Sequence, residues 1–99
     1  MRVRNLTVTL TATAAAITTE DYRCVAVYLQ PGAANSNPMY VGGADLTTAN
    51  GIRLEGYDSD GLPSAPFPMI TTQQQPIDAS KVYVVGTAGQ TVNVMLITI

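Results

Sequence analysis

The alternation of apolar residues with threonines near the start of the chain constrains the fold more than any other feature. The apolar positions are Leu6, Val8, Leu10 and Ala12, and the polar positions between them are Thr7, Thr9, Thr11 and Thr13. A period of two with many β-branched residues is typical of a pleated strand. The pattern therefore predicts a long strand with one apolar face and one threonine face.

Glycine and proline divide the rest of the chain into short segments. We interpret six of them as further strands, over residues 22–30, 39–41, 52–55, 67–71, 82–85 and 91–99. Only residues 12–21 and 77–81 could hold a helical turn, because β-branched residues follow the alanines of the first stretch at once. Seven strands in 99 residues predict an all-β fold, either a sandwich or a small barrel.

Two stretches rich in proline, glycine, serine and asparagine, residues 31–38 and 58–68, are predicted to be surface loops. The second loop is not a domain boundary, since neither side of it is long enough to fold alone. We therefore expect a single domain over residues 1–99.

The apolar phases of the strands predict the core. It should contain Leu6, Val8, Leu10, Val25, Val27, Ile52, Leu54, Val82, Val84, Val92, Val94 and Leu96. Residues 22–29 are apolar on both faces, which predicts a central strand that is buried on both sides. Cys24 lies in this run, so we interpret it as a buried and inert thiol.

Charge is sparse: 12% of the residues are charged, and the net charge is −2. The five cations are scattered along the chain and form no basic stripe, which excludes nucleic acid as an expected partner. The apolar runs are far shorter than the ~20 residues that span a bilayer, so we expect no membrane segment. A surface of neutral side chains suits a protein that works inside an assembly.

The residues for catalysis at neutral pH are missing, because the chain has no histidine, one cysteine and one lysine. Ser80 lies next to Lys81 in sequence, so the two side chains project to different sides. We interpret Asp78 and Ser80 as turn residues that bond nearby backbone amides. The sequence therefore predicts no enzyme activity.

Residues 58–61 match the beginning of a calcium-binding loop, because Asp58 and Asp60 are two residues apart and Gly61 follows them. The later ligand positions hold Leu62 and Met69, which supply no side-chain oxygen. We therefore expect a solvated acidic loop, with no metal and no cofactor required for folding.

Two segments resemble small virion proteins of tailed bacteriophages: residues 40–54 (YVGGADLTTANGIRL) and residues 76–90 (PIDASKVYVVGTAGQ), followed by the β-rich residues 92–96. The likeness covers about half of the chain and consists of turn and strand signatures. Asn50 and Gly51 are predicted to supply the positive φ of a tight turn, and Asp45 and Thr47 to bond its amides. A turn at residues 88–89 is predicted to join the last two strands into a hairpin.

The resemblance implies a single small β-sandwich, jelly-roll-like, with about seven to eight mostly antiparallel strands. It also implies a structural virion protein, a capsid cement or decoration protein that bridges major capsid subunits. Such a protein is made in the host cytoplasm, associates with itself as a dimer or trimer, and ends on the capsid surface. The alternative is a tail- or fibre-associated binding module whose loops, residues 31–38 and 58–68, contact a host glycan or receptor.

Partner-binding residues are expected at the two ends of the chain. Arg2, Val3 and Arg4 could form an arm that adds a strand to a neighbour's sheet, with the arginines pairing capsid carboxylates. Ile97 and Ile99 place apolar groups beyond the regular alternation of the last strand. In the competing interpretation, both ends are ordinary outer strands of the same sandwich.

Overall fold

The regular secondary structure of the described residues is almost entirely β-strand. The computed structural model of the protein describes residues 1–33, 35–56 and 66–99. The strands are β1 (Arg2–Thr9), β2 (Ala15–Ala16), β3 (Arg23–Pro31), β4 (Met39–Gly42), β5 (Ile52–Leu54), β6 (Phe67–Ile70), β7 (Ile77–Asp78), β8 (Tyr83–Val85) and β9 (Thr91–Thr98). A single 3-10 turn, η1 (Ala79–Lys81), lies in the second of the two stretches expected to hold a helical turn. No helix in these ranges is long and apolar enough to span a membrane.

The strands form two antiparallel sheets packed as a sandwich. The larger sheet has the order β1-β9-β3-β6, with β7 also paired to β3, and the smaller sheet has the order β2-β8-β4-β5. Without the two-residue β7, the eight remaining strands pair as first-eighth-third-sixth and second-seventh-fourth-fifth. This is the jelly-roll order, so the predicted all-β, jelly-roll-like sandwich is confirmed.

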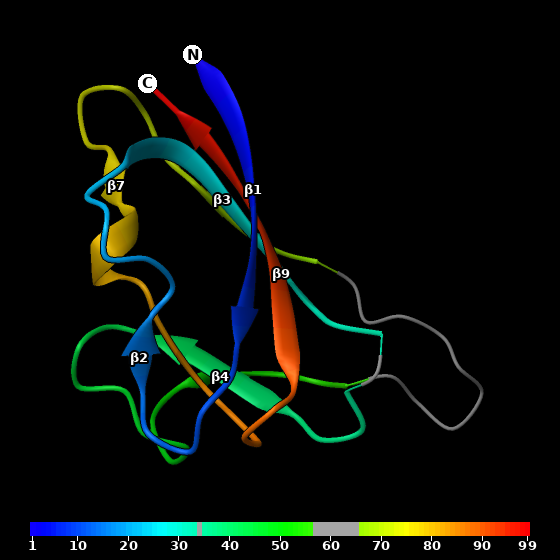
Figure 1. Ribbon diagram of the computed structural model, residues 1–99. Helices are drawn as coiled ribbons and strands as arrows, with labels where there is room; N and C mark the ends of the chain where they lie inside the picture. Colours follow the sequence, from blue (N-terminus) through cyan, green and yellow to red (C-terminus); the bar gives the residue numbers. More distant parts are fainter. Residues whose placement is uncertain (34, 57–65) are drawn as a thin grey trace.

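The two chain ends lie side by side at one end of the molecule (Figure 1). They do so because β1 and β9 pair along their whole length, from Arg2 opposite Thr98 to Thr9 opposite Thr91. The smaller sheet, seen as β2 and β4, lies toward the opposite end (Figure 1). The region near the termini is thus built mainly from the larger sheet.

The core lies between the sheets and follows the predicted apolar phases. Of the expected residues, seven are buried: Leu10, Val27, Val82, Val84, Val92, Val94 and Leu96. Leu6, Val8 and Leu54 are half-buried and pack against that cluster. Cys24 is buried and free, as expected.

The expectation for Ile52 is wrong: its side chain is 54% exposed. Ile52 lies opposite the buried Val41, so the two side chains share a face of the smaller sheet. However, β5 is the edge strand of that sheet, so Ile52 has a neighbouring strand on one side only. Alternation alone cannot show which strand lies at an edge.

Strand β3 is central, as predicted, but it is not buried evenly on both faces. The pairing with β9 shifts between Cys24 and Ala26, so that one residue is inserted as a bulge. Val25 is that residue; it is half-buried, and its carbonyl accepts a hydrogen bond from the Thr71 N–H at 2.8 Å. Tyr28 is also half-buried, because it lies on the outer face of the larger sheet.

The turn between β4 and β5 differs from the prediction. Within the described ranges, positive φ occurs at Gly89 alone, so Asn50 and Gly51 do not form the expected left-handed turn. Instead, the Asn50 side chain closes a longer loop: its Oδ1 accepts from the Thr47 N–H at 2.7 Å, and its Nδ2 donates to the Asp45 carbonyl at 3.1 Å. Gly51 is required for space, since a Cβ there would lie 2.9 Å from Tyr40 Cβ, which cannot move without its backbone.

The expected hairpin between the last two strands is wrong as well. Gly89, with φ of 90°, makes the predicted turn. However, β8 pairs with β2 and β4 in the smaller sheet, whereas β9 pairs with β1 and β3 in the larger one. The turn therefore carries the chain from one sheet to the other.

Candidate functional site

The outer face of the larger sheet carries an apolar row across all four of its main strands. Val3 lies opposite Ile97, Ile97 opposite Ala26, and Ala26 opposite Ile70. Residues directly opposite each other in a ladder project on the same side of the sheet. Val3 is 58% exposed and Ile70 is 70% exposed, with the half-buried Ile97 and the buried Ala26 between them. We call these four residues the apolar row.

The rest of this face becomes polar with distance from the chain termini. The next row contains Asn5, Met95, Tyr28 and Pro68, and the row after it contains Thr7, Asn93 and Gln30. Thr7 Oγ1 donates to Asn93 Oδ1 at 3.4 Å. A shallow pocket of about 440 Å³ lies over these two rows, with Pro66 at its margin. The face thus has an apolar end, an amphipathic middle and a neutral polar end.

The structure brings together four of the five residues predicted to bind a partner, as two pairs: Val3 with Ile97 in the apolar row, and Arg4 with Ile99 in the lining of a pocket near the chain termini. Val3 and Ile97 are direct neighbours in the apolar row. Arg2 and Arg4 have the opposite phase of β1 and lie across from Thr98 and Leu96. Ile99 follows β9; its N–H donates to the Arg23 carbonyl at 3.0 Å, and its side chain is half exposed.

The N-terminal residues form a strand at the edge of the larger sheet. Arg2, Val3 and Arg4 belong to β1, which pairs with β9 throughout. This matches the competing interpretation for the start of the chain, where the terminal segment is a strand of the same sandwich. The end of the chain matches neither the partner-binding interpretation nor the outer-strand interpretation, because β9 lies between β1 and β3 and not at an edge.

Sequence reasoning missed Ile70 and Ala26 as members of the apolar row. Ile70 belongs to a predicted strand, and its spacing from Pro68 already placed both residues on one face. The sequence carried no signal that this face would continue the one formed by Val3 and Ile97. That continuity depends on the register of β6 against β3.

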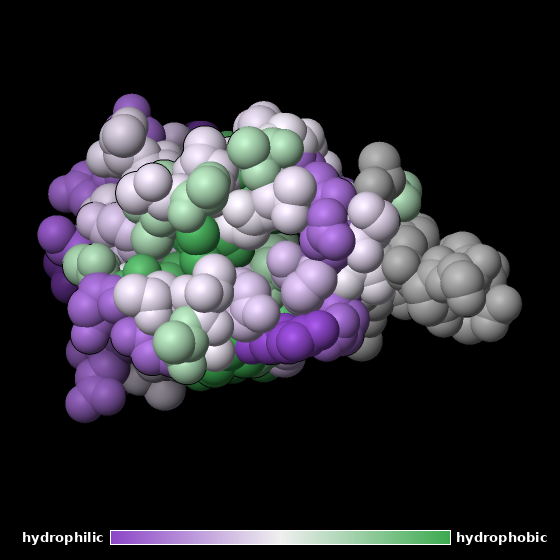
Figure 2. All heavy atoms as spheres, turned by 90° about the horizontal axis from the view of Figure 1, so that it is seen from below, coloured by the Kyte–Doolittle hydropathy of each residue, from purple (hydrophilic) through white to green (hydrophobic). Residues whose placement is uncertain are grey.

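A second surface lies at the end of the molecule opposite the termini. Figure 2 views this end, where hydrophobic side chains show at the centre, pale residues of intermediate hydropathy surround them, and hydrophilic side chains gather toward the sides. The turn at residues 86–90 and the segment from Leu10 to β2 contribute uncharged residues here. Of the large apolar side chains that are exposed among the described residues, Ile52 alone belongs to the smaller sheet, so the outer face of the larger sheet is the stronger candidate.

The residues considered for chemistry have structural roles. Asp78 Oδ1 accepts from the Ser80 N–H at 3.0 Å and from Ser80 Oγ at 2.7 Å, which caps η1 as predicted. These hydrogen bonds lower the pKa of the Asp78 carboxyl. Burial, with a smaller contribution from the Asp78 charge, raises the pKa of the Cys24 thiol, which is the direction opposite to that of a reactive cysteine.

Over residues 1–33, 35–56 and 66–99, no three histidine, cysteine, aspartate or glutamate side chains gather in a group that could hold a metal ion. The acidic segment 58–61 lies outside the described residues. The expectation that it binds no calcium stays a prediction.

Comparisons with known proteins bear on the fold. No protein-family model matches the chain, and no curated protein is similar to it in sequence. One solved structure, described as Bacillus endospore appendages that form a novel family of disulfide-linked pili, matches with a TM-score of 0.52 and 18% identity. The match covers 99% of this chain and 87% of that chain. At this identity, the likeness shows that the two chains share a fold.

Proposed function

We propose that the protein is a structural virion subunit, a cement or decoration protein that binds the outer surface of a phage capsid through the outer face of its larger sheet. The observation that carries the proposal is the apolar row, in which Val3 and Ile70 are mostly exposed. Val3 and Ile70, at the two ends of the row, gain free energy when a partner covers their exposed apolar surface. Four strands side by side suit a broad and rather flat partner surface.

A capsid compensates for the small area of such a row. Its subunits are repeated by symmetry, so copies that also touch one another bind with high effective concentration. The remainder of the face is neutral, with Thr7, Asn93 and Gln30, and such side chains lose less on desolvation than ionised ones do. Both features favour many weak contacts over one tight contact.

The resemblance to phage virion proteins concerns the scaffold rather than the docking face. Residues 40–54 form β4 and β5, and residues 76–90 form β7, η1 and β8. The apolar row instead comes from Val3, Ala26, Ile70 and Ile97, which all lie outside the matching segments. In this proposal, the sandwich is shared with the phage virion proteins, and the outer face of the larger sheet is specific to the partner of this chain.

The pilus protein that shares the fold suggests a different kind of assembly, with copies joined by disulfides. This chain has one cysteine, Cys24, and it is buried. Copies of the folded protein therefore have no accessible thiol through which to link. This supports non-covalent docking.

The test measures binding to capsids assembled without this protein. The wild type and two variants, Ile70→Asp and Ile52→Asp, would be mixed with the capsids and sedimented. The two isoleucines are both more than half exposed, but Ile70 lies in the apolar row and Ile52 lies at the edge of the smaller sheet. We expect Ile70→Asp to weaken binding by about tenfold or more and Ile52→Asp to leave it unchanged.

Circular dichroism would verify that both variants fold. Equal binding by the wild type and Ile70→Asp would contradict docking through the apolar row. Failure of the wild type to bind capsids, together with binding to purified tail fibres, would favour the tail-associated alternative.

A further inference from the structure

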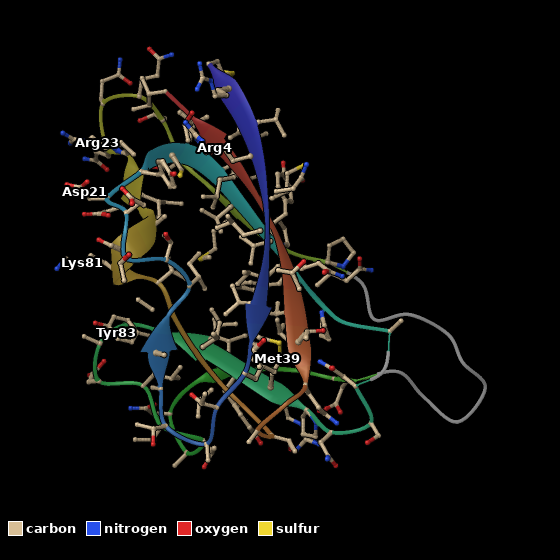
Figure 3. All side chains as sticks on the ribbon, viewed as in Figure 1. Arg4, Asp21, Arg23, Met39, Lys81 and Tyr83 are labelled. Atoms are coloured by element: carbon tan, nitrogen blue, oxygen red, sulfur yellow. The ribbon has the colours of Figure 1, made fainter. Side chains whose placement is uncertain are left out.

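A charged pocket lies at the end of the sandwich that holds the two chain termini. Its volume is about 650 Å³, and it is lined by Arg4, Tyr22, Arg23, Gln73, Gln74, Pro76, Thr98 and Ile99. Arg4 comes from β1 and Arg23 from the start of β3, and Figure 3 shows both toward this end. The side chain of Arg4 has the phase opposite to that of Val3, so the pocket and the apolar row lie on different faces of the larger sheet.

The guanidinium of Arg4 is held in place by an aromatic ring. Its central carbon lies 4.6 Å from the centroid of the Tyr22 ring. A cation over an aromatic face is attracted by the ring quadrupole, and stacking limits the orientations of the planar guanidinium. Arg4 is therefore partly organised before any ligand arrives.

The same side chain has an unused donor. Arg4 Nε is buried, and it has no hydrogen-bond acceptor among the described residues. Buried polar groups in folded proteins nearly always have a partner, so a buried donor without one, on a side chain that lines a pocket, indicates that an acceptor belongs next to it. The ring of Tyr22 contacts the guanidinium by its face and does not satisfy the N–H.

The charges around the pocket select the kind of acceptor. Its lining holds two arginines and no aspartate or glutamate. Arg23 lies opposite Asp78 and lowers the pKa of that carboxyl, so part of its charge is already engaged. Arg4 has no ion-pair partner in the part of the chain that the structure describes. The uncompensated positive charge is thus centred on Arg4.

We infer that this pocket binds the side-chain carboxylate of an acidic peptide segment. The planar guanidinium presents its N–H groups in a fork that matches a carboxylate, and a turn of the Arg4 side chain toward the pocket would let the ligand supply the acceptor that Nε lacks. Gln73 and Gln74 line the same pocket, and their side-chain amides can donate and accept hydrogen bonds to the peptide backbone next to the acid. The inference does not depend on capsid docking, because it concerns another face.

The test uses nuclear magnetic resonance, since the arginine Nε–H is itself observable. The ¹⁵N-labelled protein would be titrated with acetyl-triglutamate amide and, as a neutral match, acetyl-triglutamine amide. We expect saturable shifts of the Arg4 Nε–H and Tyr22 signals with the acidic peptide and none with the neutral one.

Three variants assign the effect. Arg4→Gln should weaken binding of the triglutamate peptide by about tenfold. Arg4→Lys, which keeps the charge but lacks the planar fork of N–H groups, should also weaken binding. Arg53→Gln is the control, because Arg53 pairs with Glu55 in the smaller sheet. The backbone spectrum of each variant shows whether it is folded.

The inference is overturned if the Arg4 Nε–H does not respond to triglutamate. It is also overturned if triglutamine shifts that signal equally, or if Arg4→Gln binds as tightly as Arg53→Gln does. None of these measurements involves capsids, so they leave the proposed function untouched.

Discussion

Asn35 joins the loop after β3 to the start of β9, and its removal should be costly. The side chain is buried, its Nδ2 donates to the Thr91 carbonyl at 2.6 Å, and its Oδ1 accepts from the Thr91 N–H at 3.0 Å. One amide thus satisfies both backbone groups of a single residue. It acts in place of a paired strand at a point where the sheet ladder ends.

The size of the effect of Asn35→Ala follows from what each Thr91 group retains. The Thr91 carbonyl still accepts from the Gly32 N–H at 2.9 Å, so losing the hydrogen bond from Asn35 costs about 1 kcal/mol. The Thr91 N–H loses the acceptor Asn35 Oδ1, and an unsatisfied donor costs about 1 to 3 kcal/mol. We therefore expect the free energy of unfolding to fall by about 2 to 4 kcal/mol, out of a total of about 5 to 15 kcal/mol.

The isosteric change Asn35→Asp sharpens the test. It replaces the donor with a carboxylate oxygen that faces the Thr91 carbonyl, so two acceptors meet. The folded state then favours the protonated carboxyl and binds more protons than the unfolded state does. Stability should fall as the pH rises above the ordinary pKa of an aspartate, about 4, and recover partly below it.

Urea denaturation followed by circular dichroism measures both effects. Asn37→Ala and Asn37→Asp are the matched controls, because Asn37 is exposed in the same loop and should change stability by less than about 0.5 kcal/mol. A loss below about 1 kcal/mol for Asn35→Ala, or the same pH profile for Asn35→Asp as for Asn37→Asp, would refute this reasoning.

Four other predictions test the fold. Leu96→Ala should lower the free energy of unfolding, measured with urea, by about 2 to 4 kcal/mol, because Leu96 is fully buried. Ile97→Ala on the outer face should lower it clearly less, and equal losses would place Leu96 outside the core. Cys24 should react with a thiol reagent only after unfolding, and rapid reaction of the native protein would contradict its burial. The pKa of the Asp78 carboxyl is lowered in the folded state, so its contribution to stability should be present above its ordinary pKa of 3.8 and fade as the pH falls through the lower folded value. Urea midpoints at a series of pH values should show this pH dependence in the wild type, and Asp78→Asn should remove it. Thermal melts with EDTA and with excess calcium should coincide, and a calcium-dependent rise in the melting temperature that Asp58→Asn with Asp60→Asn abolishes would show a metal site.

Part of the candidate docking face could be predicted from the sequence. Ile97 stood out because it breaks the alternation of its strand, and Val3 because it lies between two arginines. The pocket around Arg4 could not be predicted, since Tyr22 and Gln73 reach it from segments distant in sequence. No local pattern reports which apolar or charged side chains share a surface.

What the sequence determined by itself is the strand content and the phase of each strand. The period of two in residues 6–13 and 91–96 reflects the alternation of side chains along an extended backbone, so it can be recognised locally and predicts which residues face the core. The all-β sandwich follows from many such segments separated by glycine and proline.

The tertiary structure decided which strands are neighbours. β8 and β9 follow one another in the chain yet join different sheets, while β1 and β9, from opposite ends of the chain, pair throughout. A bulge at Val25 and an uncovered edge at Ile52 then changed two predicted burials. Pairing depends on which arrangement satisfies the most backbone groups while covering both apolar faces at once, and that competition involves the whole chain.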